Sequence, residues 1–245
     1  MKKVLIIGAS STISEHCARI WAKRGYKLYL VARNEARLQT IVADLVVRGA
    51  GQIASYCTDL NDLDRHNELL DAADSAMNGI DIVLIAHGTL SNQKSCEKSV
   101  GETLTEIQTN ALSMISLLTL IANRFEEKNE GTICVISSVA GDRGRASNYV
   151  YGSAKAMVTA FTSGLRQRLH KSNVDVVTIK PGFVDTPMTA EFKKGLLWAK
   201  PSAVAAKILR AIDLKKSEVY IPFYWRFVML IIRSLPASIF KKMGL

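Results

Sequence analysis

The sequence lacks the features that mark a secreted, metal-dependent or membrane-spanning protein. Only four of its 245 residues are cysteines, and they form neither a CxxC pair nor a cluster with histidine. Cysteines scattered in this way indicate a reduced protein without a metal site. No uninterrupted apolar run reaches the ~18 residues of a membrane-spanning helix, and the first apolar segment, Val4–Ile7, is too short for a secretory signal peptide. We therefore expect a cytoplasmic protein.

Acidic residues are scarce relative to basic ones. The chain has 22 Asp and Glu against 32 Lys and Arg, which gives a formal net charge of +10. Such an excess favours an anionic partner, namely nucleic acid, a phosphate-bearing ligand or an acidic membrane surface. The basic residues are spread along the chain and do not form one tract with interleaved aromatic residues, so we expect no nucleic-acid partner.

Short runs rich in β-branched residues alternate with longer helical patterns along almost the whole chain. Most runs lack polar alternation, as is typical of strands covered on both faces. The predicted strands are Val4–Ile7, Leu28–Ala32, Ile53–Cys57, Ile80–Ala86, Thr132–Ser137, Val174–Lys180 and Val219–Pro222. The predicted helices occupy residues 14–24, 34–48, 62–77, 101–127, 149–171 and 201–213. Repeated strand–helix units predict an α/β fold, a single Rossmann-like domain over residues 1–222 with a doubly wound parallel sheet and helices on both faces.

The turn after the first predicted strand has fewer glycines than a dinucleotide-binding turn usually carries. It opens a helix, so its backbone N–H groups and the helix amino end can face a pyrophosphate. The turn resembles that of the short-chain dehydrogenase/reductase family, Gly-x-x-x-Gly-x-Gly, but Thr12 and Ser14 replace the second and third glycines. The resemblance implies a nicotinamide cofactor, and the cofactor-binding residues expected here are Gly8, Ser10, Ser11, Thr12 and Ile13.

The two replacements have opposite expected effects. A β-carbon at Thr12 crowds the approach of the pyrophosphate and disfavours a left-handed backbone conformation. The hydroxyl groups of Thr12 and Ser14 can, in compensation, donate hydrogen bonds to phosphate. On this turn alone, a working nucleotide site and a degenerate turn that no longer binds nucleotide both remain open.

Arg33 directly follows the second predicted strand. An acidic residue there would bind the ribose 2′-hydroxyl of NAD, whereas an arginine accommodates the 2′-phosphate of NADP through paired hydrogen bonds. No Asp or Glu lies between Glu15 and Glu35, so the usual NAD signature is missing. The position predicts NADP(H) as the cofactor; the alternative is a solvated arginine near a helix start. By the family resemblance, Asp59 and Leu60 lie near the adenine.

Tyr151 and Lys155 are four residues apart in a predicted helix and therefore share one face. Free tyrosine has a pKa of about 10, and a nearby cation favours the phenolate and lowers that pKa, which suits a general acid/base. A lone Tyr-x-x-x-Lys is common on ordinary helices. Here Ser138, at the end of a predicted strand 13 residues before Tyr151, can also hydrogen-bond a substrate oxygen.

The family resemblance, which covers about residues 3–222, joins these residues into one site. It implies that Ser138, Tyr151 and Lys155 act together and that Asn110 completes a proton relay through water. The alternative for Asn110 is a helix-interior asparagine bonded to the backbone. The further cofactor contacts that the resemblance implies are Ala86, Gly88, Pro181, Val184 and Thr186. Residues 85–88 depart from the family's Asn-Asn-Ala-Gly, and we expect His87 there to be a neutral support of the cofactor pocket; the alternative is a catalytic histidine.

Residues 223–245 form a strongly apolar tail that carries Arg226, Arg233, Lys241 and Lys242. The tail is too short to span a membrane but has the composition of an interfacial helix that anionic lipids attract. An apolar tail can also close the substrate pocket or pack against another subunit. Hydropathy alone leaves these alternatives open.

The altered turn, Arg33 and the tail are together similar to the decaprenylphosphoryl-2-keto-ribose reductase branch of the family. That resemblance implies NADPH-dependent reduction of a keto-sugar carried on a polyprenyl phosphate, at the inner face of the membrane. Reduction of another hydrophobic ketone remains an alternative, as does a non-catalytic nucleotide-sensing protein. The family implies a homodimer or homotetramer, and the irregular segments 90–100 and 183–200 are expected to face the substrate.

Overall fold

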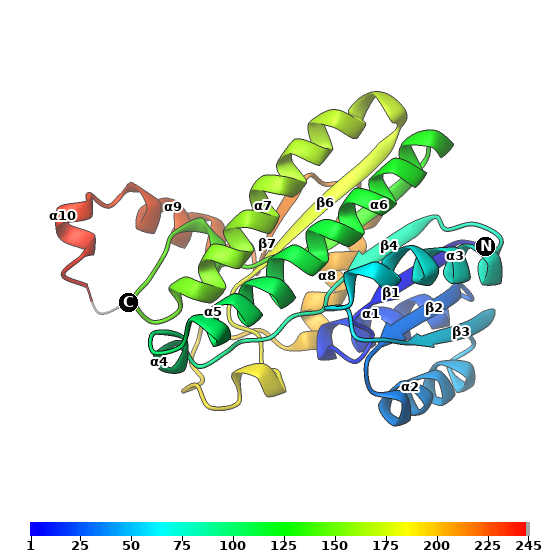
Figure 1. Ribbon diagram of the computed structural model, residues 1–245, viewed down its shortest axis with the longest axis horizontal. Coiled ribbons are helices and arrows are strands. Elements are labelled where there is room, and N and C mark those ends of the chain that lie inside the picture. Colours follow the sequence, from blue (N-terminus) through cyan, green and yellow to red (C-terminus); the bar gives the residue numbers. More distant parts are fainter. Residues whose placement is uncertain (244–245) are drawn as a thin grey trace.

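Seven strands form one parallel sheet in the order β3-β2-β1-β4-β5-β6-β7, seen at the centre of the computed structural model, which describes residues 1–243 (Figure 1). The strands are β1 (Lys3–Ile7), β2 (Lys27–Ala32), β3 (Gln52–Cys57), β4 (Ile82–Ile85), β5 (Gly131–Ile136), β6 (Val174–Pro181) and β7 (Glu218–Ile221). The strand order reverses between β1 and β4. In doubly wound sheets, ligands bind at such a switch point, outside the carboxyl ends of the strands.

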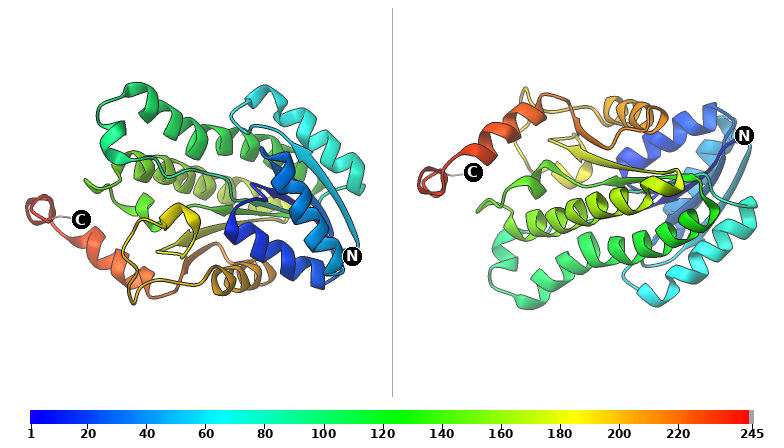
Figure 2. Two further views of the ribbon diagram at one scale, coloured as in Figure 1. Left: turned by 90° about the horizontal axis from the view of Figure 1, so that it is seen from below. Right: turned by 90° about the horizontal axis from the view of Figure 1, so that it is seen from above.

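Helices cover both faces of the sheet (Figure 2). The main ones are α1 (Thr12–Lys23), α2 (Glu35–Val47), α3 (His66–Met77), α5 (Val100–Ile107), α6 (Ser113–Lys128), α7 (Tyr149–Leu169) and α8 (Pro201–Asp213). Two short helices, α4 (Gln93–Cys96) and the 3-10 turn η3 (Val139–Asp142), lie in connecting segments. The predicted fold class is confirmed, and the predicted strand ends agree with the structure to within two residues.

The sheet separates two apolar cores, which explains the absence of polar alternation in the strands. Along β1, Val4 and Ile6 enter the core formed with α1, α2 and α8, whereas Leu5 and Ile7 enter the core formed with α3, α6 and α7. Successive side chains of a strand point to opposite faces. A strand covered on both faces must therefore be apolar at every position.

The segment Val100–Lys128 departs from the single regular helix predicted over 101–127. It contains one turn of π-helix, η2 (Gln108–Leu112), between α5 and α6. By length and composition alone this segment could cross a membrane. In the fold, however, apolar side chains of α6 such as Leu117 and Ile121 are buried against the sheet, as expected for a core helix.

The tail leaves the body of the molecule as α9 (Trp225–Ser234) and α10 (Ala237–Phe240), which extend beyond one end of the sheet (Figures 1 and 2). Trp225 and Met229 anchor α9 against Val139 of η3. The guanidinium of Arg143 donates hydrogen bonds to carbonyl oxygens at the carboxyl end of α9, including that of Leu235 at 2.7 Å. The last two residues of the predicted tail, 244–245, lie outside the described residues.

Candidate active site

The turn between β1 and α1 approaches the loop after β4 very closely. Gly8 has a φ of +85°, and its N–H donates to the carbonyl oxygen of Val31 at 2.9 Å. A β-carbon at Gly8 would lie 2.5 Å from the backbone nitrogen of His87. Only glycine fits this conformation and this contact. Gly8 thereby brings together the carboxyl ends of β1 and β4, on either side of the switch point.

The amino end of α1 offers free backbone donors next to this turn. Ser11 precedes the helix and makes no side-chain cap, while Ser10 is exposed and Thr12 and Ile13 are partly exposed. The first N–H groups of a helix have no partner within it, and the helix dipole favours an anion there. The close contact of Gly8 with the loop after β4 and the uncapped amino end of α1 together fit the pyrophosphate of a dinucleotide.

The structure corrects two expectations about the replaced glycines. Thr12 begins a right-handed helix, and the non-glycine residues with positive φ within 1–243 all lie elsewhere. The missing glycine therefore leaves no left-handed strain at this turn. Ser14 is fully buried, and its hydroxyl has no hydrogen-bond partner among the described residues. Its hydroxyl thus faces the protein interior and not a phosphate.

Arg33 lies one residue beyond β2, at the same edge of the sheet as the turn. Its side chain is exposed and makes no hydrogen bond or ion pair within residues 1–243. Its carbonyl oxygen accepts a hydrogen bond from Cys57 Sγ at 3.5 Å. The nearby Arg37, by contrast, is already paired with Glu15. The guanidinium of Arg33 is therefore available to a ligand phosphate.

The two residues expected near the adenine differ in exposure. Asp59 is exposed, and its carboxylate accepts from the backbone N–H of Asn61 at 3.0 Å. The side chain of Leu60 is buried in the core that includes α3 and α6. A contact of Leu60 with a cofactor would consequently involve its backbone.

The four predicted catalytic residues lie at one end of the sheet. Tyr151 and Lys155 are on α7, Ser138 directly precedes η3, and Asn110 lies in the π-helical turn. The Lys155 ammonium nitrogen is 5.6 Å from the centre of the Tyr151 ring. A β-carbon at Gly88 would lie 2.5 Å from Asn110 Oδ1 and 3.5 Å from Lys155 Nζ, so both side chains reach the same stretch of backbone after β4.

Two glycines hold the Ser138 loop against the helix that carries Tyr151. A β-carbon at Gly141 would lie 2.7 Å from the backbone nitrogen of Ala156, and one at Gly152 would lie 2.9 Å from the carbonyl oxygen of Ala140. Contacts this short leave no room for a side chain. The packing of η3 on α7 therefore depends on these glycines, and it places Ser138 beside the Tyr151 phenol.

The protonation of the Tyr151/Lys155 pair differs from the sequence expectation. Burial, together with the charge of Glu106, raises the pKa of Tyr151 to about 12, while the Ser138 side chain acts in the opposite direction. Burial lowers the pKa of Lys155 to about 8, and the charge of Glu106 partly counteracts this. In the protein without cofactor, removal of the phenol from water therefore dominates, and the expected lowering of the Tyr151 pKa is not found. The phenol is a proton donor.

Asn110 is fully buried and makes both backbone and side-chain hydrogen bonds. Its Nδ2 donates to Thr89 Oγ1 at 3.1 Å and to the carbonyl oxygen of Glu106 at 3.2 Å. Its Oδ1 accepts from the backbone N–H of Thr89 at 3.2 Å. A π-helical turn at this position is typical of functional sites, and it directs the amide towards the loop after β4.

His87 stays neutral, as its predicted supporting role requires. Burial, followed by the charge of Lys155, lowers the pKa of His87 to about 3. Its Nε2 is 2.8 Å from Ser113 Oγ, and its Nδ1 has no partner among the described residues.

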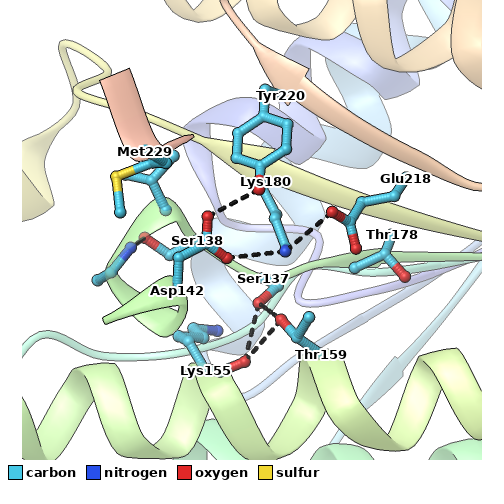
Figure 3. A network of polar contacts seen from close by, with 12 residues as sticks. Ser137, Ser138, Asp142, Lys155, Thr159, Thr178, Lys180, Glu218, Tyr220 and Met229 are labelled. Carbon is cyan, nitrogen blue, oxygen red and sulfur yellow. Dashed lines mark hydrogen bonds and ion pairs between the residues drawn. The ribbon is translucent and has the colours of Figure 1, made fainter. Parts of the chain in front are cut away.

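A second buried lysine anchors the loop that carries Ser138 (Figure 3). Lys180, near the end of β6, forms ion pairs with Asp142 of η3 at 2.8 Å and with Glu218 of β7 at 3.0 Å. The Tyr220 hydroxyl donates to the other oxygen of Asp142 at 2.8 Å. This network fixes η3 to the sheet, because Asp142 is the last residue of that turn.

The adjacent serines have different surroundings (Figure 3). Ser137 is buried, and its hydroxyl bonds the carbonyl oxygen of Lys155 at 3.0 Å and Thr159 Oγ1 at 2.7 Å. Ser138 is partly exposed, and its Oγ accepts from the N–H of Ala140 at 3.1 Å. Ser138 is therefore the serine that a substrate can reach.

The segment after β6 joins the expected nicotinamide contacts to the tail. Pro181 ends β6, Val184 is buried, and Thr186 begins a short 3-10 turn. Between them, Phe183 stacks on Trp198 and meets Trp225 of α9 edge-on, each with ring centres 5.4 Å apart. Trp225 at the start of α9 thus packs beside the segment that is expected to contact the nicotinamide.

Glu106 is a site residue that the sequence reasoning missed. It lies one helical turn before Asn110 and is only 1% exposed. Its charge acts on both Tyr151 and Lys155. An acidic residue at helical spacing from Asn110 is the signal that could have pointed to it, but such residues usually face solvent.

Comparison with known proteins identifies the chemistry of this class of site. A family model described as short chain dehydrogenase matches residues 2–196. The chain belongs to the short-chain dehydrogenase/reductase family. This short-chain dehydrogenase/reductase is 34% identical over 240 residues to an uncharacterized oxidoreductase of Mycobacterium tuberculosis, covering 98% of this chain and 96% of the relative. It is 30% identical over 243 residues to an uncharacterized oxidoreductase of Streptomyces coelicolor, covering 99% and 96%. It is accordingly an oxidoreductase that uses a nicotinamide cofactor.

Proposed function

We propose that the protein is an NADPH-dependent reductase that converts a carbonyl group of a lipid-linked or otherwise hydrophobic substrate into an alcohol. The observation that carries this proposal is that Tyr151 lies beside both Ser138 and Lys155, and that the Lys155 ammonium reaches the backbone at Gly88, next to the switch point of the sheet. The keto-sugar of a polyprenyl phosphate is the substrate class that we favour. A phosphate-bearing lipid suits both the +10 net charge and the apolar tail.

Each residue of the convergent group has a distinct role in this reaction. A bound NADPH would supply the hydride. Tyr151, whose pKa of about 12 keeps it protonated, donates a proton to the substrate oxygen. Ser138 donates a hydrogen bond to that oxygen, and the Lys155 ammonium stabilises the phenolate that remains. Asn110 holds the water through which the proton is replaced.

The preference for NADPH rests on Arg33. We expect Arg33→Ala to weaken NADPH binding by about 10- to 100-fold, since a charge-assisted hydrogen bond contributes about 1.5–3 kcal/mol. NADH binding should stay unchanged, because NADH has no 2′-phosphate. Fluorescence titration of both nucleotides measures this, with Arg210→Ala as the control; Arg210 is an exposed arginine in the last turn of α8. If the wild type binds neither nucleotide, the reductase proposal fails. If it binds NADPH but never oxidises it, the result supports a nucleotide-sensing protein.

The outer face of α9 and α10 supports binding to the inner face of a membrane. Phe227, Leu230 and Ile231 are all more than half exposed. After Glu218 the chain contains no acidic residue up to Met243, while it contains Arg226, Arg233, Lys241 and Lys242. An exposed apolar helix face with only basic neighbours suits an anionic lipid surface. Binding to the membrane through this face would bring the active site close to a substrate that is carried on a lipid.

Vesicle sedimentation tests the membrane proposal. Wild-type protein should bind vesicles that contain phosphatidylglycerol and should bind pure phosphatidylcholine vesicles much less. The triple variant Phe227→Ser, Leu230→Ser, Ile231→Ser should lose this binding, whereas Val47→Ser, at an exposed apolar position on α2, should keep it. If the triple variant instead dissociates a homodimer or homotetramer and vesicle binding never occurs, the tail is a subunit interface.

A further inference from the structure

Glu106 presents a carboxylate inside the protein next to the proposed proton relay. It lies on α5 and is 1% exposed. Its Oε2 accepts hydrogen bonds from Thr89 Oγ1 at 2.7 Å and from the Ser91 hydroxyl, and its Oε1 has no partner among the described residues. Burying a carboxylate is costly unless it is paired and hydrogen-bonded. The proposed roles of Ser138, Tyr151, Lys155 and Asn110 do not account for it.

Thr89 links Glu106 to Asn110. The Thr89 hydroxyl donates to Glu106 and accepts from Asn110 Nδ2 at 3.1 Å, while the Thr89 N–H donates to Asn110 Oδ1 at 3.2 Å. A hydroxyl has one proton, so its donation to Glu106 forces it to accept from Asn110. This order of donors and acceptors fixes the orientation of the amide: Nδ2 faces the Thr89 hydroxyl, and Oδ1 faces the Thr89 N–H and Gly88, where the Lys155 ammonium also lies.

Glu106 is also the acidic group that acts on Lys155. The titratable groups around the ammonium are Tyr151 on α7, Glu106 on α5 and His87 after β4, and His87 is neutral. Burial raises the pKa of the Cys96 thiol on α4, and the charges of Glu106 and of the exposed Glu102 on α5 act in the same direction. No carboxylate forms an ion pair with Lys155 within residues 1–243, so Glu106 supplies its charge from a distance.

We propose that Glu106 is a positioning residue for the proposed reaction: through Thr89 it orients Asn110, whose Oδ1 lies over the same glycine, Gly88, as the Lys155 ammonium. The expected effect on kcat rests on the proposed reductase function. The expected effect of the Glu106 charge on the titration of Lys155 does not, because that titration is measured without cofactor or substrate.

The charge effect is tested by NMR titration of lysines labelled with carbon-13 at Cε, in the chain without cofactor. Lys155→Arg identifies the Lys155 signal. In Glu106→Gln the midpoint of Lys155 should move to lower pH, because a negative charge favours the ammonium and its removal does not. Glu102→Gln, which removes an exposed carboxylate one turn earlier on α5, should leave the midpoint unchanged. An unchanged midpoint in Glu106→Gln would overturn the charge effect of Glu106 on Lys155.

The orienting effect is tested by Thr89→Val, which keeps the charge and removes the hydroxyl between Glu106 and Asn110. We expect the Lys155 midpoint to remain and kcat to fall about tenfold. Glu106→Asp should likewise keep the midpoint, because it retains a carboxylate, and it tests the orienting role alone. Wild-type kcat in both Thr89→Val and Glu106→Asp would overturn the orienting role. If the wild type shows no NADPH turnover, the reductase proposal fails, while the lysine titration still decides the charge effect.

Discussion

Lys155 and Lys180 are buried to the same extent but have opposite surroundings. Each is 3% exposed. Burial lowers the pKa of both ammonium groups, but for Lys180 the hydrogen bonds and charges of Asp142 and Glu218 outweigh burial and raise its pKa. Lys155 donates to the carbonyl oxygen of Ile136 at 3.4 Å, and its pKa falls to about 8.

The difference separates a lysine that stabilises the fold from one that can take part in a reaction. Lys180 joins β6, β7 and η3 through a network whose charges are matched. Lys155 is left with an unmatched charge beside Tyr151. An unmatched buried charge costs stability and is retained where its reactivity is used. The two lysines should therefore respond differently to the same substitution.

The largest expected effect is on turnover in Lys155→Met. We expect the rate of NADPH-dependent reduction to fall by about 10²–10⁴-fold, because the phenolate of Tyr151 loses its neighbouring cation. The melting temperature should not fall, since no ion pair is broken. Steady-state kinetics and thermal unfolding measure the two effects, with Lys171→Met as the exposed-lysine control. If Lys155→Met instead loses much stability and keeps normal turnover, Lys155 has the structural role that we assign to Lys180.

Lys180→Met should have the complementary effect. It leaves Asp142 buried without its cation, and we expect the free energy of unfolding to fall by about 3–5 kcal/mol. Urea unfolding measures this value. The double variant Lys180→Met, Asp142→Leu should recover part of the loss, because neither charge is then left unpaired. If the single variant is as stable as the wild type, the network does not hold η3 to the sheet.

The pH dependence of turnover should follow Lys155. Its pKa of about 8 means that the ammonium is present below that pH and is lost as the pH rises through it. We expect the rate of reduction to fall about tenfold for each further pH unit, because one proton is lost. Lys180 stays charged throughout, since its pKa is raised. Initial rates from pH 6 to about 10 test this sign, and a rate that increases above pH 8 would contradict it.

Ser137→Ala is expected to have the smallest effect. It removes hydrogen bonds to the Lys155 carbonyl oxygen and to Thr159, and a buried hydrogen bond contributes about 1 kcal/mol. We therefore expect a small loss of stability and nearly normal turnover. Ser138→Ala should show the reverse, with a stable protein and turnover reduced by about 10²-fold. Equal losses of turnover would mean that Lys155 depends on Ser137 for its position.

Most of the fold could be predicted because the apolar pattern is local and continuous. β1 is apolar at every position from Val4 to Ile7, and it is covered on both faces. The π-helical turn between α5 and α6 was not predicted, because the apolar pattern continues through it; within this turn Asn110 bonds to Thr89, a residue distant along the chain. The burial of Ser14 depends in the same way on how α1 packs.

The sequence by itself determined the alternation of strands and helices of an α/β fold, the Tyr151/Lys155 spacing and the place of Arg33 after the second strand, because these depend on short stretches of chain. Only the tertiary structure decided which charges are matched. Asp142 of η3 and Glu218 of β7 form ion pairs with Lys180, whereas the charge that acts on Lys155 belongs to Glu106 on another helix, α5. Burial and distance between such groups set their pKa values, and neither quantity is contained in residue spacing.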